Sequence, residues 1–522
     1  MRTFRPVTTV LTAQAIRPDY RSGETFRHLV IVGGTVRALT DSAAEAARAA
    51  GPGASWVDLG IAWVGPGFID THVHALQAAA DARRVSLRDA AALADALAAV
   101  RAAGAGRGAD EWTVTGRNWH ESQLREGRLP TTAELDALGL PGPVLLRRGS
   151  HLAVLNSRAA ARLAPMPADP DALIARALDL AGRPGPAERA SDLAAVLARF
   201  NARGLTSIRE AGVDRGELDL FRALRDQGRL SMRCDLLWRV AEASDPAAAR
   251  EQIARMPPAG PDDDPYLRLT GVKAFVDGRI ADAAIAGGPA AGSLRMRPAD
   301  LNELVEAALR RSSGLGCHAV GDQAVRIVLD AYERALAAGL APDPRRLVIE
   351  HALDCTPDTV RRLAAAGVGV SAHPAIAYEF AADIRRYWGE EPAARAAPVR
   401  DMLAAGVRVA AGSDGDVPPF DPLRGIWFMV TRQGRDGGPL GAGQAVPRQV
   451  AFDLYTRCGA ELLGVGARRG MLRPGMDADL VAFAADPMSG PADELPETGI
   501  RLTVLGGRAV YDPQRLMEEA GA

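Results

Sequence analysis

Eight short apolar runs rich in β-branched residues recur along this 522-residue chain, and most are followed by a helix-like stretch rich in Ala, Leu and Arg. Apolar strands that alternate with helices predict a parallel sheet covered by helices. Eight such units predict a closed (β/α)8 barrel of the TIM type, with its chemistry at the carboxyl ends of the strands. The predicted strands are residues 62–74, 204–212, 231–240, 267–278, 314–322, 346–352, 367–374 and 407–415.

The βα rhythm is interrupted once and is absent at both ends of the chain. Roughly 130 residues separate the first two strands, far more than one helical crossover needs. We therefore predict an insertion at about 76–200 that caps the mouth of a barrel formed by residues 64–465. Short β runs with glycine-containing turns predict a small composite β-sandwich built from residues 1–63 and 466–522.

Composition excludes several functional classes. The chain is 48% hydrophobic and 24% charged, which is typical of a globular protein. A formal net charge of -2 gives no basic surface for nucleic acid, and no run of 18 apolar residues predicts a membrane span. The first residues lack the apolar segment of a signal peptide. Four widely spaced cysteines without a CxxC motif favour a reducing compartment, so we expect a cytoplasmic protein that acts on a small molecule.

Lysine is almost absent from the chain. Of 62 Lys and Arg residues only Lys273 is a lysine, and it lies within the predicted strand 267–278. An amine can lose its proton and react, whereas a guanidinium stays protonated. A buried cationic lysine is costly, but a lysine that carries CO2 as a carbamate is an anion able to bridge two metal ions. The alternative is the chance survival of one surface lysine.

Five of the eight histidines lie at or near the ends of predicted barrel strands. His72 and His74 are two residues apart on a strand, so both imidazoles face one side and can reach one ion. Imidazole and carboxylate ligands suit Zn, Mn, Fe or Co. The alternative for each residue is a hydrogen-bonded core position. The predicted metal ligands are His72, His74, Lys273, His318, His351 and Asp414.

The hypothesis for the reaction is hydrolysis by water that one or two divalent metal ions, Zn above all, activate. Asp414 would accept the proton of this water and return it to the leaving amine. His151 would hydrogen-bond the developing oxyanion, although it can equally well cap the turn at Asn156. The weaker candidates for the substrate pocket are Trp119, His120, Asp277, Arg279 and His373.

This pattern resembles the amidohydrolase superfamily, whose binuclear site has HxH on strand 1, Lys on strand 4, His on strands 5 and 6 and Asp on strand 8. It is most similar to amidohydrolase family 3, in its N-substituted formamide deformylase-like (YtcJ-like) branch. The resemblance implies a C–N hydrolase acting on an amide, N-formyl or cyclic amide compound, and such enzymes are often homo-oligomers. The motifs are PGFIDTHVH (66–74), LPTTAELD (129–136), PVLLRRGSHLAVLNSRAA (143–160), GVKAFVDG (271–278), HAVGDQAV (318–325) and AGSDGDV (411–417).

Two departures from the branch bear on the substrate. Arg148-Gly149-Ser150 precedes His151 where the branch usually has Asp-Gly, and Arg279 stands where small residues are common. Three alternatives compete with this hypothesis. Lys273 decides against a mononuclear deaminase, which lacks the strand-4 lysine and has a Glu soon after the strand-5 histidine, where this chain has Ala319-Val320-Gly321-Asp322. A lactonase or esterase uses the same metal site, and a non-catalytic barrel typically loses its ligands.

Overall fold

The computed structural model of the protein divides into two compact units. The first unit comprises Met1–His74, Leu197–Gly415 and Pro419–Ala522, and the second comprises Ala75–Val196 and Asp416–Pro418. The structure describes residues 7–117, 119–149, 152–240, 246–258, 264–286, 292, 294–311, 314–341, 343–415 and 420–517.

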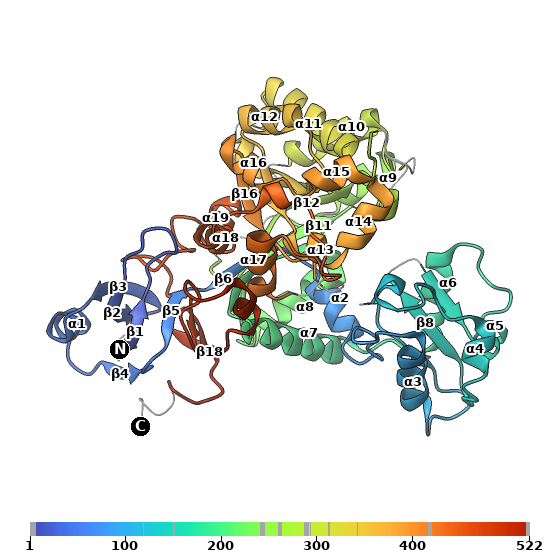
Figure 1. Cartoon of the computed structure of the whole chain (residues 1–522), viewed down its shortest axis with the longest axis horizontal. Coiled ribbons are helices and arrows are strands. Elements are labelled where there is room, and N and C mark those ends of the chain that lie inside the picture. The colour runs from blue at the N-terminus through green and yellow to red at the C-terminus, as the bar shows by residue number, and fades with distance from the viewer. Residues whose placement is uncertain are drawn as a thin grey trace. The chain divides into compact units, whose positions relative to one another are not determined.

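A sheet of eight parallel strands forms the centre of the first unit (Figure 1). Its strands follow one another in chain order, which confirms the prediction of a (β/α)8 barrel. The barrel nearly closes because the amide of Asp414 donates to the carbonyl of His72 at 2.8 Å and that of His74 to Gly415 at 2.7 Å. The strands are β6 (Phe68–Val73), β10 (Leu205–Val213), β11 (Arg233–Arg239), β12 (Leu267–Phe275), β13 (Gly314–Ala319), β14 (Leu347–His351), β15 (Gly369–Ala372) and β16 (Arg408–Ala411).

Helices connect these strands, and local signals fix their ends. The helix after β10 starts with a capping box between Asp214 and Glu217, and the helix after β14 ends at Gly367, whose φ is 67°. Both devices satisfy backbone groups that the helix leaves unpaired. The helices of this unit are α8 (Arg215–Asp226), α9 (Pro246–Ala254), α10 (Pro298–Arg310), α11 (Asp322–Ala337), α12 (Pro357–Ala366), α13 (Pro374–Glu379), α14 (Ala381–Trp388), α15 (Glu390–Arg395), α16 (Val399–Ala404), α17 (Pro422–Thr431), α18 (Arg448–Leu454) and α19 (Arg457–Leu462).

The two ends of the chain meet in one mixed sheet, as the β runs predict (Figure 1). Strands from the first and the last part of the chain pair directly, because β5 (Trp63–Pro66) is antiparallel to β17 (Leu480–Phe483). A core cluster that includes Leu11, Leu29 and Leu480 packs against this sheet. The strands are β1 (Thr8–Ile16), β2 (Phe26–Val32), β3 (Thr35–Thr40), β4 (Ser55–Asp58), β5 (Trp63–Pro66), β17 (Leu480–Phe483), β18 (Ile500–Leu505) and β19 (Arg508–Tyr511), and helix α1 (Ala43–Ala50) packs beside β2 and β3.

The predicted first strand, 62–74, is two strands in the structure. Its first half, β5, belongs to the terminal sheet, and its second half, β6, belongs to the barrel. They part at Gly67, whose amide donates to Asp479 and where a Cβ atom would lie 2.4 Å from Thr206. Because glycine has no side chain, the chain can run close to Thr206 here and cross from one sheet to the other.

The second unit contains a three-stranded sheet and its own apolar core, and its residue range includes most of the predicted insertion. Trp119 lies in that core at 1% exposure, and its indole N–H donates to the carbonyl of Arg147 at 2.5 Å. The elements are α2 (Ala75–Asp81), α3 (Leu93–Gly104), β7 (Thr113–Val114), α4 (Thr132–Asp136), β8 (Val144–Arg148), β9 (Leu152–Leu155), α5 (Ser157–Arg162), α6 (Pro170–Leu180) and α7 (Pro186–Asn201), of which the residues from Leu197 on belong to the first unit.

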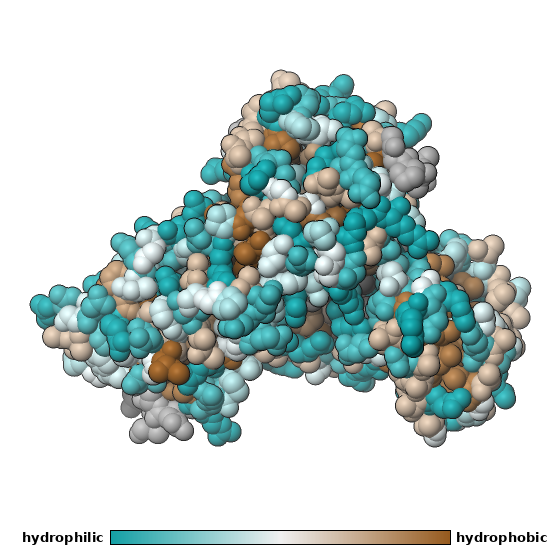
Figure 2. Space-filling model, viewed as in Figure 1, coloured by the Kyte–Doolittle hydropathy of each residue, from teal (hydrophilic) through white to brown (hydrophobic). Residues whose placement is uncertain are grey.

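Hydrophilic side chains cover much of the face of the molecule drawn in Figure 2, and strongly apolar areas on it are small and scattered. Among the described residues, no helix has the length and apolar character that crossing a membrane requires.

Candidate metal centre

The carboxyl end of β6 brings two imidazoles to one carboxylate. The Nε2 atoms of His72 and His74 lie 3.2 Å and 3.1 Å from the same Oδ1 atom of Asp414. Burial alone would raise the pKa of this carboxyl, but the imidazoles of His72 and His74 outweigh it, and the pKa lies well below its usual value. Asp414 is therefore an anion within reach of two nitrogen ligands. Its backbone φ of 55° is unusual for a residue with a side chain and indicates local strain.

The second ring nitrogen of His72 is held by a buried ion pair. Its Nδ1 atom lies 2.7 Å from Oε2 of Glu350, which is fully buried on β14. Arg209 on β10 donates to both carboxylate oxygens of Glu350, at 2.6 Å and 2.9 Å. Burial alone would raise the pKa of Glu350, but Arg209 and His72 outweigh it and hold the pKa far below its usual value. Glu350 thus accepts the Nδ1 proton of His72 and leaves the Nε2 lone pair available for a ligand bond.

Lys273 lies inside the barrel next to His72. Its Nζ atom is 3.2 Å from His72 Nε2 and 5.1 Å from the ring centre of Phe275, and the residue is 1% exposed. Burial lowers the pKa of this amine, although Glu350 and Asp414 oppose the shift. The single lysine of the chain is therefore placed among the predicted metal ligands, in surroundings that favour its neutral, nucleophilic form.

His351 breaks the alternation of its strand. Successive residues of a strand face opposite sides, so Glu350 and His351 cannot both point inward from regular β14. A φ of 76° at His351 and of 46° at Ala352 turns the chain and allows both. Burial lowers the pKa of His351 well below its usual value, so the ring is neutral. Its Nε2 atom is buried and has no hydrogen-bond partner in the described structure.

His373 and His318 flank His351. Their ring centres lie 4.2 Å and 4.4 Å from that of His351. His318 is positioned by its Nε2 atom, 3.0 Å from the carbonyl of Gly278, and burial lowers its pKa to about 3. Burial likewise lowers the pKa of His373 well below its ordinary value. His318, His351 and His373 are therefore neutral imidazoles on one side of the site.

Asp277 holds the loops around His318. Its carboxylate accepts the amides of Val320 and Gly321, both at 2.9 Å, and that of Ala284 at 3.1 Å. Burial raises its pKa to about 6, although these amides lower it in part. This predicted pocket residue is engaged with backbone groups and fixes the loops that follow β12 and β13.

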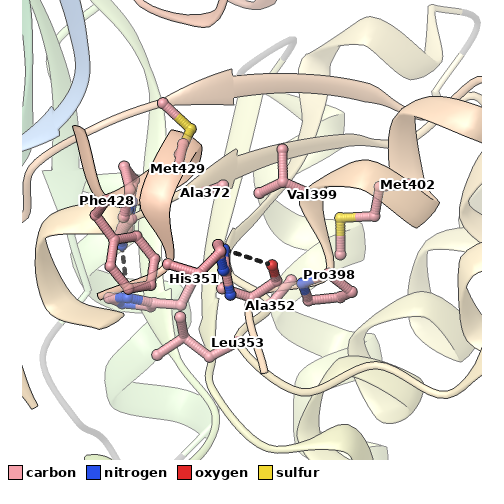
Figure 3. A pocket seen from close by; sticks show the side chains of 13 residues that line it. His351, Ala352, Leu353, Ala372, Pro398, Val399, Met402, Phe428 and Met429 are labelled. Atoms are coloured by element: carbon pink, nitrogen blue, oxygen red, sulfur yellow. Dashed lines mark hydrogen bonds between the residues drawn. The ribbon is translucent and has the colours of Figure 1, made fainter. Parts of the chain in front are cut away.

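An apolar pocket adjoins His351 and His373. Figure 3 shows His351 among Leu353, Phe428 and Met429, three of the residues that line it. Phe428 and Met429 come from α17, which follows the strand that leads to Asp414. Apolar walls of this kind keep water from the imidazoles and favour their neutral form.

The other predicted pocket residues lie elsewhere or outside the description. Trp119 is in the core of the second unit, and His120 in that unit accepts the amide of Ser122 and caps a short 3-10 helix. Arg279 is exposed in the first unit, and its amide donates to Asp282. His151 lies outside the described residues.

Sequence reasoning missed Glu350 and Arg209, which orient His72. The available signal was a pair of opposite charges in otherwise apolar strands, LVIEH and LTSIREAG. Buried charges of this kind need partners, so the two strands predict an ion pair inside the barrel.

The donor set fits a divalent cation. Ligand atoms of His72, His74 and Asp414 lie within 4.8 Å of one another, and those of His351, His373 and Asp414 do so too. The orphaned Nε2 atom of His351 is a further nitrogen donor. Neutral nitrogen and anionic oxygen donors without cysteine are the ligands of catalytic Zn and related metals.

A parallel barrel with imidazoles and a carboxylate at the carboxyl ends of its strands defines the class of metal-dependent barrel hydrolases. Within that class, the chain belongs to the amidohydrolase family, whose model matches residues 56–511.

Relatives and solved structures agree with this assignment. The chain is 28% identical to the N-substituted formamide deformylase of Arthrobacter pascens over 521 residues, covering 92% of this chain and 94% of that protein. It is 25% identical to the amidohydrolase candidate YtcJ of Bacillus subtilis (strain 168) over 484 residues, covering 86% and 88%. An uncharacterized metal-dependent hydrolase from Pyrococcus furiosus superposes with a TM-score of 0.72 at 25% identity, covering 92% of this chain and all of that one.

Proposed function

We propose that this metal-dependent amidohydrolase hydrolyses the C–N bond of a small amide, N-formyl or cyclic amide compound. The observation that carries the proposal is the convergence of His72 and His74 on one carboxylate oxygen of Asp414. The likeness to a formamide deformylase over nearly the whole chain supports a C–N substrate.

We propose Zn as the metal, held by the four imidazoles of His72, His74, His318 and His351, by Asp414, and by Lys273 as a carbamate. The lowered pKa of Lys273 makes its amine nucleophilic. The neutral amine attacks CO2, a C–N bond forms as one C–O π bond of CO2 opens onto its oxygen, and one proton leaves the nitrogen for solvent, which yields an N-carboxylate anion. This anion offsets the cationic charge of metal ions in a pocket whose imidazoles are neutral.

A bound divalent metal lowers the pKa of water toward about 7 and polarises the scissile carbonyl. Asp414 accepts the proton of the attacking water on a carboxylate oxygen and transfers it to the leaving nitrogen. Glu350 and Arg209 keep the ring of His72 oriented during this step.

Lys273→Arg tests the carbamate, because a guanidinium keeps a positive charge and cannot be carboxylated. We expect the wild-type protein, purified with Zn and bicarbonate, to bind close to two metal ions per chain by plasma mass spectrometry, and the variant to lose at least one of them. Lys273→Glu, which restores an anion, is the matched control and should recover part of the metal.

Full metal content in Lys273→Arg contradicts the carbamate. A wild-type protein that takes up no metal contradicts the hydrolase itself. Paired substrates that differ only in amide against ester then test the bond: faster hydrolysis of lactones and esters than of amides contradicts C–N specificity.

A further inference from the structure

A chain of four hydrogen bonds leads from a backbone carbonyl to His351. The hydroxyl of Thr71 on β6 lies 3.0 Å from the carbonyl of Ala411 on β16, and 2.7 Å from the hydroxyl of Ser371 on β15. Ser371 Oγ is 3.2 Å from Nε2 of His373, and His373 Nδ1 is 2.6 Å from Nδ1 of His351. All four side chains are buried.

The carbonyl at one end gives this chain of hydrogen bonds a single direction. A carbonyl only accepts, so the one hydroxyl proton of Thr71 goes to Ala411, and Ser371 must donate to Thr71. Ser371 has then used its own proton, so it accepts from His373, which carries its N–H on Nε2.

The direction continues through the two rings. A neutral imidazole has one N–H, so Nδ1 of His373 is an acceptor, and His351 must donate to it from Nδ1. The Nε2 atom of His351 is then a bare lone pair, which agrees with its lack of a partner among the described residues. The carboxylate of Glu350, 4.0 Å from Nε2 of His373, independently favours a proton on that nitrogen.

We propose that Thr71, Ser371 and His373 are positioning residues that fix the tautomer of His351, so that its Nε2 lone pair is ready for the metal. The proposal rests on the metal site of the proposed function and assigns His373 to the support of that site rather than to the metal or the substrate. It gives His351 the same tautomer that Glu350 gives His72, through uncharged groups in place of a carboxylate.

Nitrogen NMR of the metal-free protein, labelled with 15N-histidine and kept in chelator, reads the tautomers directly. We expect the proton of His351 on Nδ1 and that of His373 on Nε2. In Thr71→Val, the hydroxyl of Ser371 loses its acceptor and turns to donate to His373, so part of the His351 population moves its proton to Nε2. A wild-type His351 protonated on Nε2, or unchanged tautomers in Thr71→Val, overturns the proposal.

A buried hydroxyl away from the site provides the matched control. Thr503 donates to the carbonyl of Asn201 at 2.7 Å and is fully buried, so Thr503→Val loses the same kind of bond as Thr71→Val. We expect both variants to lose similar stability, whereas only Thr71→Val changes the tautomers. Equal tautomer changes in the two variants contradict a specific role for the hydrogen bonds that lead from Thr71 to His351.

Zn affinity, measured by chelator competition, gives a second readout. Glutamine at position 373 can accept from His351 with its carbonyl and donate to Ser371 with its amide, whereas leucine can do neither. We expect His373→Gln to stay within about 3-fold of the wild-type Zn affinity, and His373→Leu to weaken it about 10- to 100-fold. Equal weakening in both variants, or a His373 nitrogen signal that shifts to a metal-bound position on adding Zn, overturns the positioning role. A wild-type protein that binds no Zn contradicts the proposed function, and with it the metal role, while the tautomer assignment is still tested by the metal-free spectra.

Discussion

The two ends of the barrel both bury charge, and they manage it in opposite ways. At the amino end of β11, Arg233 donates to both carboxylate oxygens of Asp479, at 2.6 Å and 2.9 Å, and lies 3.4 Å from Asp477. Asp477 also lies 3.4 Å from Arg469. Two buried arginines face two aspartates there, and the half-exposed Arg468 also donates to Asp477 at 3.0 Å. At the carboxyl ends of the strands, imidazoles surround Asp414, and Nε2 of His351 has no partner in the described structure.

This difference separates stability from function. The paired cluster joins the barrel to the terminal sheet, since Arg233 belongs to β11 and Asp479 directly precedes β17. The cluster at the carboxyl ends leaves donor atoms without partners and holds His351 and Asp414 in strained backbone conformations. Binding of a ligand offsets the free energy that both features cost. We therefore expect substitutions at one end to affect activity and substitutions at the other to affect unfolding.

The largest effect is expected at Asp414. Asp414→Asn removes the proton acceptor and an anionic ligand, so kcat should fall about 10³-fold or more while the protein stays folded. Steady-state kinetics with saturating Zn and circular dichroism measure the two quantities. A fall of less than about 10-fold would assign the proton transfer to another group.

A large effect on stability is expected at the other end. Arg233→Met leaves the carboxylate of Asp479 buried without its main partner, which should lower the free energy of unfolding by about 3–5 kcal/mol. Urea denaturation measures this loss, and metal content per folded chain should not change. Loss of metal in a folded Arg233→Met protein would contradict the separation of the two ends.

The smallest effect concerns pH. Burial lowers the pKa of His318 to about 3 and lowers those of His74, His351 and His373 as well. The unfolded chain binds protons on these rings below about pH 6.5 and the folded metal-free protein does not. Its free energy of unfolding should therefore fall with pH below 6.5, by about 1 kcal/mol per pH unit for each neutral ring.

Buried carboxyls oppose this trend. Burial raises the pKa values of Asp70, Asp277 and Asp354 to about 6 and also raises that of Asp421, so these groups stabilise the folded state as the pH falls. The four rings outweigh these carboxyls between pH 7.5 and 5.5, because the unfolded rings take up protons from about pH 6.5 and the folded carboxyls only from about pH 6. The urea midpoint in chelator should therefore be lower at pH 5.5 than at pH 7.5. An equal or higher midpoint at pH 5.5 would show that the imidazoles are protonated in the folded protein.

Much of the fold was predictable because it follows from local patterns of apolar and helix-forming residues. All eight barrel strands overlap the apolar runs that predict them, and a helix-like stretch of the sequence follows most of these runs. Local patterns did not predict the split at Gly67, since it depends on Thr206 and Asp479, which are distant in sequence.

The candidate site was predictable in its residue types and less so in their geometry. The structure brings His72, His74, Lys273 and Asp414 together from three separate regions of the chain. Asp277 and Trp119 have the right chemistry for a pocket, but the structure engages Asp277 with backbone amides and buries Trp119 in an apolar core.

The sequence by itself determined the eight βα units and the presence of imidazoles, one lysine and one aspartate at strand ends, because strand periodicity and residue chemistry are local properties. Only the tertiary structure decided which ring nitrogen of His72 and of His351 is available to a ligand. That choice depends on Glu350, Arg209 and the chain through Ser371, whose contacts join strands hundreds of residues apart. Closure of the barrel brings these strands side by side or across from one another. The buried group on each side of an imidazole then decides which ring nitrogen carries the proton.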